Sequence, residues 1–196
     1  MRARRMTRSF SEEPIDEAVV ESLLDTARHV PSAGSSQGFE FLVLAGREQI
    51  DRYWGVTLPG AKRSGFRWQG LLRAPLLVVV YADADAYVAR YGEADKSSTG
   101  LGFDRDAWST PYWLVDASFA ALGLQLAAID AGLGVLFFGV FDHEKAVADE
   151  FGVPASLEVV GALAIGHPDG GDDTEPGRSV SRLRRPLDDM VHRGNW

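Results

Sequence analysis

The feature that most constrains the fold is an unbroken apolar run, LLVVVYA, from Leu76 to Ala82. Such a run indicates a β-strand covered on both faces, because a strand with one wet face alternates apolar and polar side chains. Pro75, which has no backbone N–H to donate to a sheet, comes directly before the run and suits the start of a strand. The chain must therefore place other elements on both sides of this strand.

Apolar periodicity elsewhere in the chain predicts further helices and strands. We expect helices at about 14–30, 48–54, 116–131 and 143–151, and strands at 39–45, 135–140 and 157–165. Asp16 is a plausible N-cap of the first helix, and Pro31 ends it. The helix at 116–131 is apolar nearly all round, which is typical of a helix buried in a core or at a subunit interface. Residues 83–111 are polar and rich in glycine, so we expect a long loop or lid with a little helix.

No repeat or linker divides the chain, so the prediction is a single domain over residues 1–196 of the α+β class, built on a sheet of four internal strands. The chain is long enough to bury a sizeable core, with 196 residues of which 45% are hydrophobic. The absence of cysteine excludes disulfides and thiolate metal sites, and the four histidines are scattered, so no metal site is expected. We expect no membrane segment and a cytoplasmic location.

Charge is distributed unevenly along the chain. The formal net charge is −8, which argues against a nucleic-acid partner. Arginines nevertheless crowd both ends of the chain: Arg2, Arg4, Arg5, Arg8, Arg178, Arg182, Arg184, Arg185 and Arg193. These ends are either solvated tails or the two halves of a grip on a small anionic ligand.

Several familiar catalytic and binding motifs are absent. Gly55 to Lys62 resembles a phosphate-binding loop, but Ala61 separates Gly60 from the lysine that must follow it directly. The glycines at 132 and 134 lack the third glycine of a dinucleotide-binding turn. No serine stands in a G-x-S-x-G motif, which makes an ordinary esterase a poor interpretation.

Four segments in order along the chain carry a resemblance to a known family. They are RRMTRSF at 4–10, VPSAGSSQGFEF at 30–41, GLGVLFFGVFD at 132–142 and RLRRPLDDMVHRGNW at 182–196. This set resembles the nitroreductase family of FMN-dependent oxidoreductases, in particular its short actinobacterial-type members. The resemblance implies a three-layer α+β sandwich with a central, mainly antiparallel sheet flanked by helices. It also implies an intertwined homodimer in which a C-terminal arm, about 178–196, extends onto the partner subunit.

The same resemblance implies a set of FMN-binding residues. A basic group would hold the phosphate, since an arginine fork binds two of its oxygens at once: Arg4, Arg5, Arg182 and Arg184. A loop between the first helix and the first strand would meet the flavin and its ribityl chain: Ser32, Gly34, Ser35 and Gln37. The backbone of Phe138 and Gly139 would face the flavin ring, where an N–H can bond to N5. No side chain is expected to act as a catalytic acid or base, because the flavin carries the chemistry.

The implied activity is hydride transfer from NAD(P)H through flavin N5 to a small oxidant, by ping-pong kinetics. A nitroaromatic, a quinone or an activated alkene is the expected oxidant. An alternative is a flavin or deazaflavin carrier without turnover, which is favoured by Met6 and Ser35, where the family commonly has Ser and Asn. Another is a specialised flavin-dependent dehydrogenase or dehalogenase. A stand-alone interaction domain ranks last, because it gives the arginines at the two ends no role.

Overall fold

The computed structural model describes residues 5–171 and 183–196. Four strands form one sheet in the order β1-β2-β4-β3, and each of the three strand pairs is antiparallel. The strands are β1 (Phe39–Ala45), β2 (Leu76–Asp83), β3 (Gly134–Phe138) and β4 (Leu157–Gly166). All four coincide with the predicted strands to within two residues at each end.

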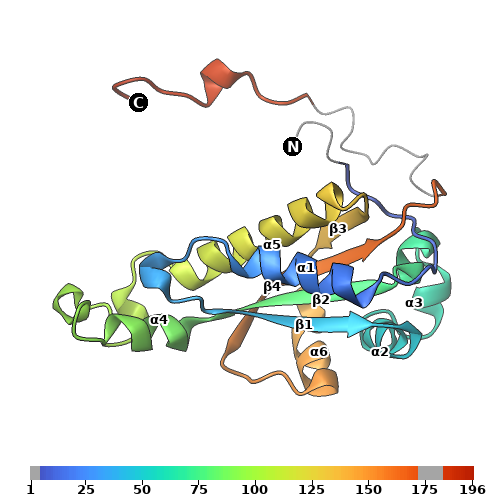
Figure 1. The fold of residues 1–196 in the computed structure, drawn as a ribbon, viewed down its shortest axis with the longest axis horizontal. Helices are drawn as coiled ribbons and strands as arrows, with labels where there is room; N and C mark the ends of the chain where they lie inside the picture. The colour runs from blue at the N-terminus through green and yellow to red at the C-terminus, as the bar shows by residue number, and fades with distance from the viewer. Residues whose placement is uncertain (1–4, 172–182) are drawn as a thin grey trace.

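Helices cover both faces of this sheet, so the molecule has three layers (Figure 1). On one face lie α1 (Glu17–Arg28) and α5 (Tyr112–Asp130), and on the other lie α2 (Arg47–Thr57) and α6 (Glu144–Phe151). Side chains of β2 alternate between the two cores: Val78 and Val80 pack with α1 and α5, and Val79 packs with α2 and α6. The unbroken apolar run is therefore explained by burial on both faces, and the predicted three-layer α+β sandwich is confirmed.

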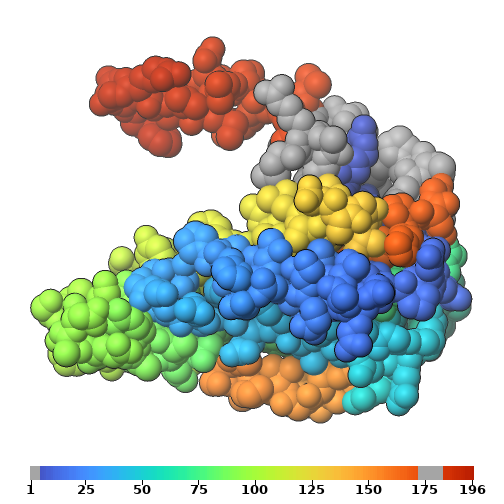
Figure 2. Space-filling view, viewed as in Figure 1, coloured from blue at the N-terminus to red at the C-terminus, as the bar shows by residue number. Residues whose placement is uncertain are grey.

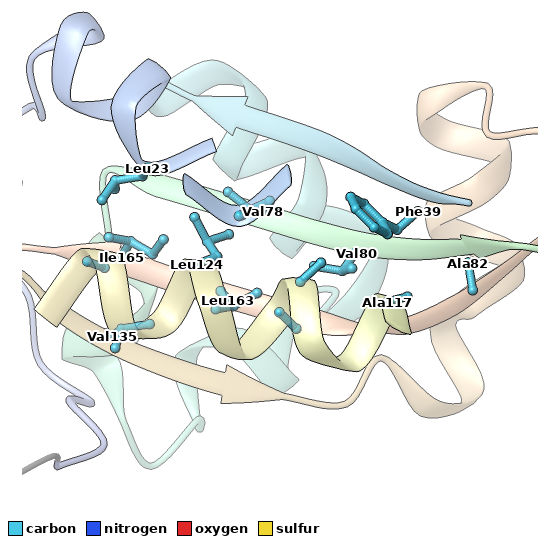
Figure 3. Packing of buried hydrophobic residues seen from close by; sticks show 14 of the residues in the cluster. Leu23, Phe39, Val78, Val80, Ala82, Ala117, Leu124, Val135, Leu163 and Ile165 are labelled. Atoms are coloured by element: carbon cyan, nitrogen blue, oxygen red, sulfur yellow. The ribbon is translucent and has the colours of Figure 1, made fainter. Parts of the chain in front are cut away.

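The core between α5 and the sheet is built from small and branched side chains (Figure 3). Leu124 and Ala117 of α5 point toward Val78, Val80 and Leu163 of the sheet (Figure 3). Leu124 and Leu163 are fully buried. Burial of a leucine side chain stabilises a fold by about 1.5–3 kcal/mol, so this layer is a main source of stability.

The structure moves the start of one predicted helix and adds two helices that the sequence analysis did not place. Helix α5 begins at Tyr112, four residues before the predicted start, because the carbonyl of Pro111 accepts hydrogen bonds from the N–H groups of Leu114 and Val115. The segment expected to be mostly loop opens with an eight-residue helix, α4 (Ala84–Tyr91). Asp83 starts this helix by accepting hydrogen bonds from the N–H groups of Asp85 and Ala86. A short helix, α3 (Ala61–Ser64), was also missed.

The C-terminal residues that are described, 183–196, lie apart from the rest of the chain in this view (Figure 2). They contain one short 3-10 turn, Leu187–Asp189, and all of them are exposed. Leu183 is 90% exposed and Trp196 is fully exposed. Within residues 5–171 and 183–196, nothing covers these apolar side chains.

Helix α5 is long and apolar enough to cross a membrane by length and composition alone. A core helix of a globular protein passes the same test. Asp116 and Gln125 are buried within α5 in contact with other elements of the chain, and the helix packs on the sheet. Its position is therefore that of the central core helix.

Candidate functional site

The loop that joins α1 to β1 has an unusual backbone. Gly34, Ser35 and Gln37 all have positive φ values, of 62°, 58° and 50°. Residues with a Cβ pay about 1–2 kcal/mol for this conformation. Two such residues within one short loop require contacts from elsewhere in the fold to hold them, as is common where a backbone binds a ligand. Because the resemblance predicts that this loop meets the flavin, we refer to residues 32–37 as the cofactor loop.

A buried carboxylate holds the first half of the cofactor loop. One oxygen of Asp116, Oδ2, accepts a hydrogen bond from the backbone N–H of Ala33 and another from the hydroxyl of Tyr87, each at 2.7 Å. Asp116 is 3% exposed and Tyr87 is fully buried. Burial first, and the Asp116 carboxylate second, raise the pKa of Tyr87 well above its ordinary value. The phenol therefore stays protonated and remains a donor to Asp116.

Helix α4 holds the second half of the loop. Arg90 donates from Nε to the carbonyl of Gly34 at 2.9 Å, and its two terminal nitrogens bond to the two carboxylate oxygens of Asp95 at 2.8 Å each. The ring of Tyr91 lies so close to Gly34 that a Cβ there would be 2.7 Å from it. Only glycine fits under this ring at this backbone conformation.

Polar side chains of the cofactor loop bond within the loop and also reach its surface. Ser32 Oγ accepts from the N–H of Gln37 at 3.0 Å, and Ser36 Oγ donates to the carbonyl of Ala33 at 2.7 Å. Ser35 and Gln37 are exposed, with 3.5 Å between the hydroxyl oxygen of one and the amide nitrogen of the other. The loop therefore exposes a hydroxyl and an amide, while Asp116 and Arg90 hold its backbone in place through hydrogen bonds.

An aromatic cavity of about 340 Å³ adjoins this loop at Ala33. Its other lining residues come from the segment expected to be a lid and from the start of α5: Tyr91, Leu101, Trp108, Ser109, Thr110 and Tyr112. Trp108 is the centre of the wall, with its ring centroid 4.7 Å from that of Tyr91 and 6.0 Å from that of Tyr112. Its indole N–H donates to the carbonyl of Leu101 at 2.9 Å. The cavity thus combines aromatic faces with the aliphatic hydroxyls of Ser109 and Thr110 and the phenol hydroxyls of Tyr91 and Tyr112.

The second predicted group of site residues lies along β3. The N–H of Thr7 donates to the carbonyl of Val135 at 3.0 Å, and Thr7 is buried. Arg5, two residues earlier, is exposed. Phe138 ends β3 and stacks on Trp54, with ring centroids 6.0 Å apart and planes 15° from parallel. The ring of Phe141 lies over Gly139, where a Cβ would be 2.6 Å from it.

The two groups are not brought together within one copy of the chain. The cofactor loop leads into β1 and Phe138 ends β3, and these strands are the two edges of the sheet. Three strand spacings separate the edges, which is about 14 Å. Arg184 is exposed in the C-terminal segment, while Arg4 and Arg182 lie outside the described residues. A single copy therefore presents the predicted residues as separate partial sites.

Sequence reasoning missed the residues that hold the cofactor loop from behind: Asp116, Tyr87, Arg90 and Tyr91. One signal was available, because Asp116 is a lone acidic residue near the start of a helix that is otherwise apolar nearly all round. A charge at such a position needs a buried partner, although the sequence does not say which one. Among residues 5–171 and 183–196, no group of three or more His, Asp or Glu side chains is placed to hold a metal ion.

Comparison with known proteins agrees with the fold and with the order of the motifs. A protein of Archaeoglobus fulgidus described as an NADH dehydrogenase/NAD(P)H nitroreductase is 26% identical, over 98% of this chain and 94% of its own length. A 5,6-dimethylbenzimidazole synthase of Rhodospirillum rubrum is 30% identical, over 84% of this chain and 78% of its own. A nitroreductase-fold protein of Exiguobacterium sibiricum, solved in complex with FMN, superposes with a TM-score of 0.69 at 18% identity, covering 97% of this chain and 93% of that one.

The sequence pattern that defines the nitroreductase family matches residues 1–167, which include β1 to β4 and the cofactor loop. This match spans most of the chain, and the Archaeoglobus fulgidus relative aligns over nearly the full length of both chains. The chain belongs to the nitroreductase family and is an oxidoreductase.

Proposed function

We propose that this chain is an FMN-dependent oxidoreductase that uses NAD(P)H to reduce a small oxidant. The observation that carries the proposal is the cofactor loop, whose backbone is held in a strained conformation by a buried carboxylate and which adjoins an aromatic cavity. Its glycine, exposed hydroxyl and exposed amide suit a ligand with a flat ring and a hydroxylated chain. The relative solved with FMN supports the same cofactor here.

In this proposal FMN supplies the redox chemistry at its N5 atom, taking hydride from NAD(P)H and passing it to a nitroaromatic, quinone or activated alkene in ping-pong fashion. The chain's own residues bind and orient. Arg5 and Arg184, with Arg4 and Arg182, hold the phosphate, while Ser32, Gly34, Ser35 and Gln37 hold the ribityl chain and ring edge. The backbone of Phe138 and Gly139 faces the ring. The residues that line the aromatic cavity exclude water around the oxidant.

We further propose that the working form is a homodimer. The outward side of α5 carries an apolar stripe at a spacing of four and three residues, which is formed by the exposed or half-buried side chains of Val115, Phe119, Leu122 and Leu126. Phe119 and Leu122 are 45% and 39% exposed, an unfavourable state for large apolar side chains. Two copies joined along this stripe would cover it and could bring the cofactor loop of one copy to the β3 end of the other.

The cytoplasm, where NAD(P)H is available, is the proposed location.

The visible absorption spectrum of the purified protein tests the proposal. We expect a bound yellow flavin after incubation with FMN, which bleaches when NADPH is added without oxygen. Arg184→Ala should weaken FMN binding by about ten- to a hundredfold, because it removes charge-assisted hydrogen bonds to the phosphate. Arg193→Ala is the control, since this arginine lies in the same exposed segment but is not one of the four predicted phosphate-binding arginines. A protein that stays colourless with FMN would overturn the proposal.

A second candidate is a specialised flavin-dependent reaction, which is favoured by the 30% identity to a 5,6-dimethylbenzimidazole synthase. Chromatography of reaction mixtures containing FMN, NADPH and oxygen would detect a benzimidazole product if this chain shared that activity. Sustained NADPH oxidation with a quinone, and no such product, favours the first candidate. A flavin or deazaflavin carrier would bind the cofactor stoichiometrically without oxidising NADPH.

A further inference from the structure

We propose that Asp116 is a positioning residue that sets the shape of the cofactor loop before FMN binds. In this proposal Tyr87 holds the Asp116 carboxylate in place by donating a hydrogen bond to it. The inference rests on the proposed function for the identity of the ligand. Its structural basis is independent of any ligand, because the contacts involved lie entirely among buried or half-buried groups of this chain.

Asp116 connects parts of the chain that are distant in sequence. Its partner Ala33 is 83 residues away, and its other partner, Tyr87, is 29 residues away. Both donors converge on the same oxygen, Oδ2. The Ala33 N–H opens the turn that contains Gly34 and Ser35, so fixing this one group fixes the entry to the positive-φ residues.

Helix α4 supports the loop over its whole length. Tyr87, Arg90 and Tyr91 are spaced by three and four residues, so they share one face of α4. Tyr91 packs on Gly34, and Tyr87 packs on Gly38 at the other end of the loop, where a Cβ would lie 2.6 Å from its ring. Tyr87 therefore has two roles, as a ring against Gly38 and as the hydroxyl donor to Asp116.

Loss of the Asp116 contact releases the loop toward ordinary backbone conformations. Ser35 and Gln37 favour negative φ, and without the carboxylate the N–H of Ala33 loses its acceptor. FMN would then have to order the loop on binding, which weakens affinity because the ordering entropy is paid at that step. The side chains that would hold the flavin are themselves unchanged.

The test compares three variants of the whole chain. Asp116→Leu removes the acceptor, Tyr87→Phe removes one donor and keeps the ring against Gly38, and Asp116→Asn keeps an acceptor oxygen. Glu158→Leu is the matched control, because Glu158 accepts a hydrogen bond from Trp113 of the same helix at 3.1 Å and lies 3.7 Å from Arg105, but makes no hydrogen bond to residues 32–37 in the described part of the chain. Two quantities are measured: the dissociation constant of FMN by absorbance titration, and the exchange rate of the Ala33 amide in protein without added FMN.

We expect Asp116→Leu to raise the dissociation constant at least tenfold and to speed exchange at Ala33 by a similar factor. Tyr87→Phe should give a smaller change in the same direction, Asp116→Asn should restore most of the affinity, and Glu158→Leu should match the wild type. If Asp116→Leu does not fold, Tyr87→Phe decides. A wild type that binds FMN together with variants of unchanged affinity and unchanged exchange would overturn the inference. A wild type that never binds FMN overturns the proposed function instead.

Discussion

At the scale of single residues, the cofactor loop shows how one glycine can serve both shape and packing. Gly34 has a positive φ and lies under the ring of Tyr91, so it meets two requirements that no other residue satisfies together. Gly152, which follows α6, also lies in the left-handed region, with φ of 70°, but no atom lies within 4 Å of the place where its Cβ would be. The two glycines therefore separate the cost of backbone strain from the cost of steric overlap.

Substitution of each glycine by alanine measures these two costs. Gly152→Ala should lower the free energy of unfolding by about 1 kcal/mol, through backbone strain alone. Gly34→Ala should lower it by about 2–4 kcal/mol, because the Tyr91 ring must also move. Urea denaturation of both variants checks this. Equal losses would mean that the Tyr91 ring moves away without cost.

At the scale of elements, hydrogen bonds and burial hold the N-terminal segment around Phe10 against the rest of the domain. Phe10 is fully buried, its N–H donates to the carbonyl of Gly70, and its carbonyl accepts from Arg73. The carboxylate of Asp169, which follows β4, pairs with the same Arg73. These contacts fix the course of the chain before α1, and hence the place from which Arg5 projects.

The pH dependence of stability measures the contribution of the Asp169–Arg73 ion pair. The Ser9 hydroxyl, the Gly171 N–H and the Arg73 guanidinium lower the pKa of Asp169 below its ordinary 3.8. Because the folded-state pKa is the lower one, the contribution of Asp169 to stability is present above pH 3.8 and is lost as the pH falls through the folded-state value.

Asp169→Asn should therefore reduce the free energy of unfolding by about 1 kcal/mol at pH 7, and by much less near the folded-state pKa, where the wild-type carboxylate is itself protonated. Denaturation at a series of pH values checks this. Asp149→Asn is the control, since Asp149 pairs with Lys145 on an exposed part of α6 and should change stability by less than about 0.5 kcal/mol. A loss for Asp169→Asn that is the same at every pH would contradict the expectation.

Helix α4 shows what reasoning from composition left open at this scale, since a little helix was expected in residues 83–111 but not placed. The segment after β2 is polar and rich in glycine, which is typical of a loop, yet Asp83 caps a helix whose inward face carries Tyr87 and Tyr91. The sequence did hold a signal for this helix: Asp83 can cap a helix start, and Tyr87 and Tyr91 are four residues apart and so lie on one helix face. Tertiary packing of the two tyrosines on Gly38 and Gly34 makes so short a helix stable.

At the scale of the whole molecule, the predicted site residues that the structure describes are divided between the two edges of one sheet, and Phe119 and Leu122 of the apolar stripe on α5 are exposed. Phe119→Asp should convert a dimer into monomers, because it places a charge in the centre of the proposed interface. Sedimentation velocity at micromolar concentration checks this. Phe103→Asp is the control, since Phe103 is 85% exposed and lies outside α5.

Monomer formation by Phe119→Asp should be accompanied by loss of bound FMN, since each site would draw on both copies. A wild type that sediments as a monomer, or a Phe119→Asp variant that remains dimeric, would rule out an interface along this stripe. A monomeric variant that keeps its FMN would show instead that one copy is enough to form the site.

The sequence by itself determined the elements and their class. Local spacing of apolar residues records which face of a helix or strand is buried, so all four strands and helices α1, α2, α5 and α6 could be predicted from it. The motifs around Gly34 and Phe138 also placed the chain in its family, as the match over residues 1–167 confirms. Apolar spacing is a property of neighbouring residues, and the motifs are recognised by their order along the chain, so both can be read without knowing the tertiary structure.

Only the tertiary structure decided which elements meet. The strand order β1-β2-β4-β3 puts the cofactor loop and Phe138 at opposite edges, which no local pattern records. The bond between Asp116 and Ala33 spans 83 residues, and a buried carboxylate has no period or motif that names its partner. Periodicity shows which side chains are removed from water. The order and direction of the elements in the fold decide which other residues those side chains contact.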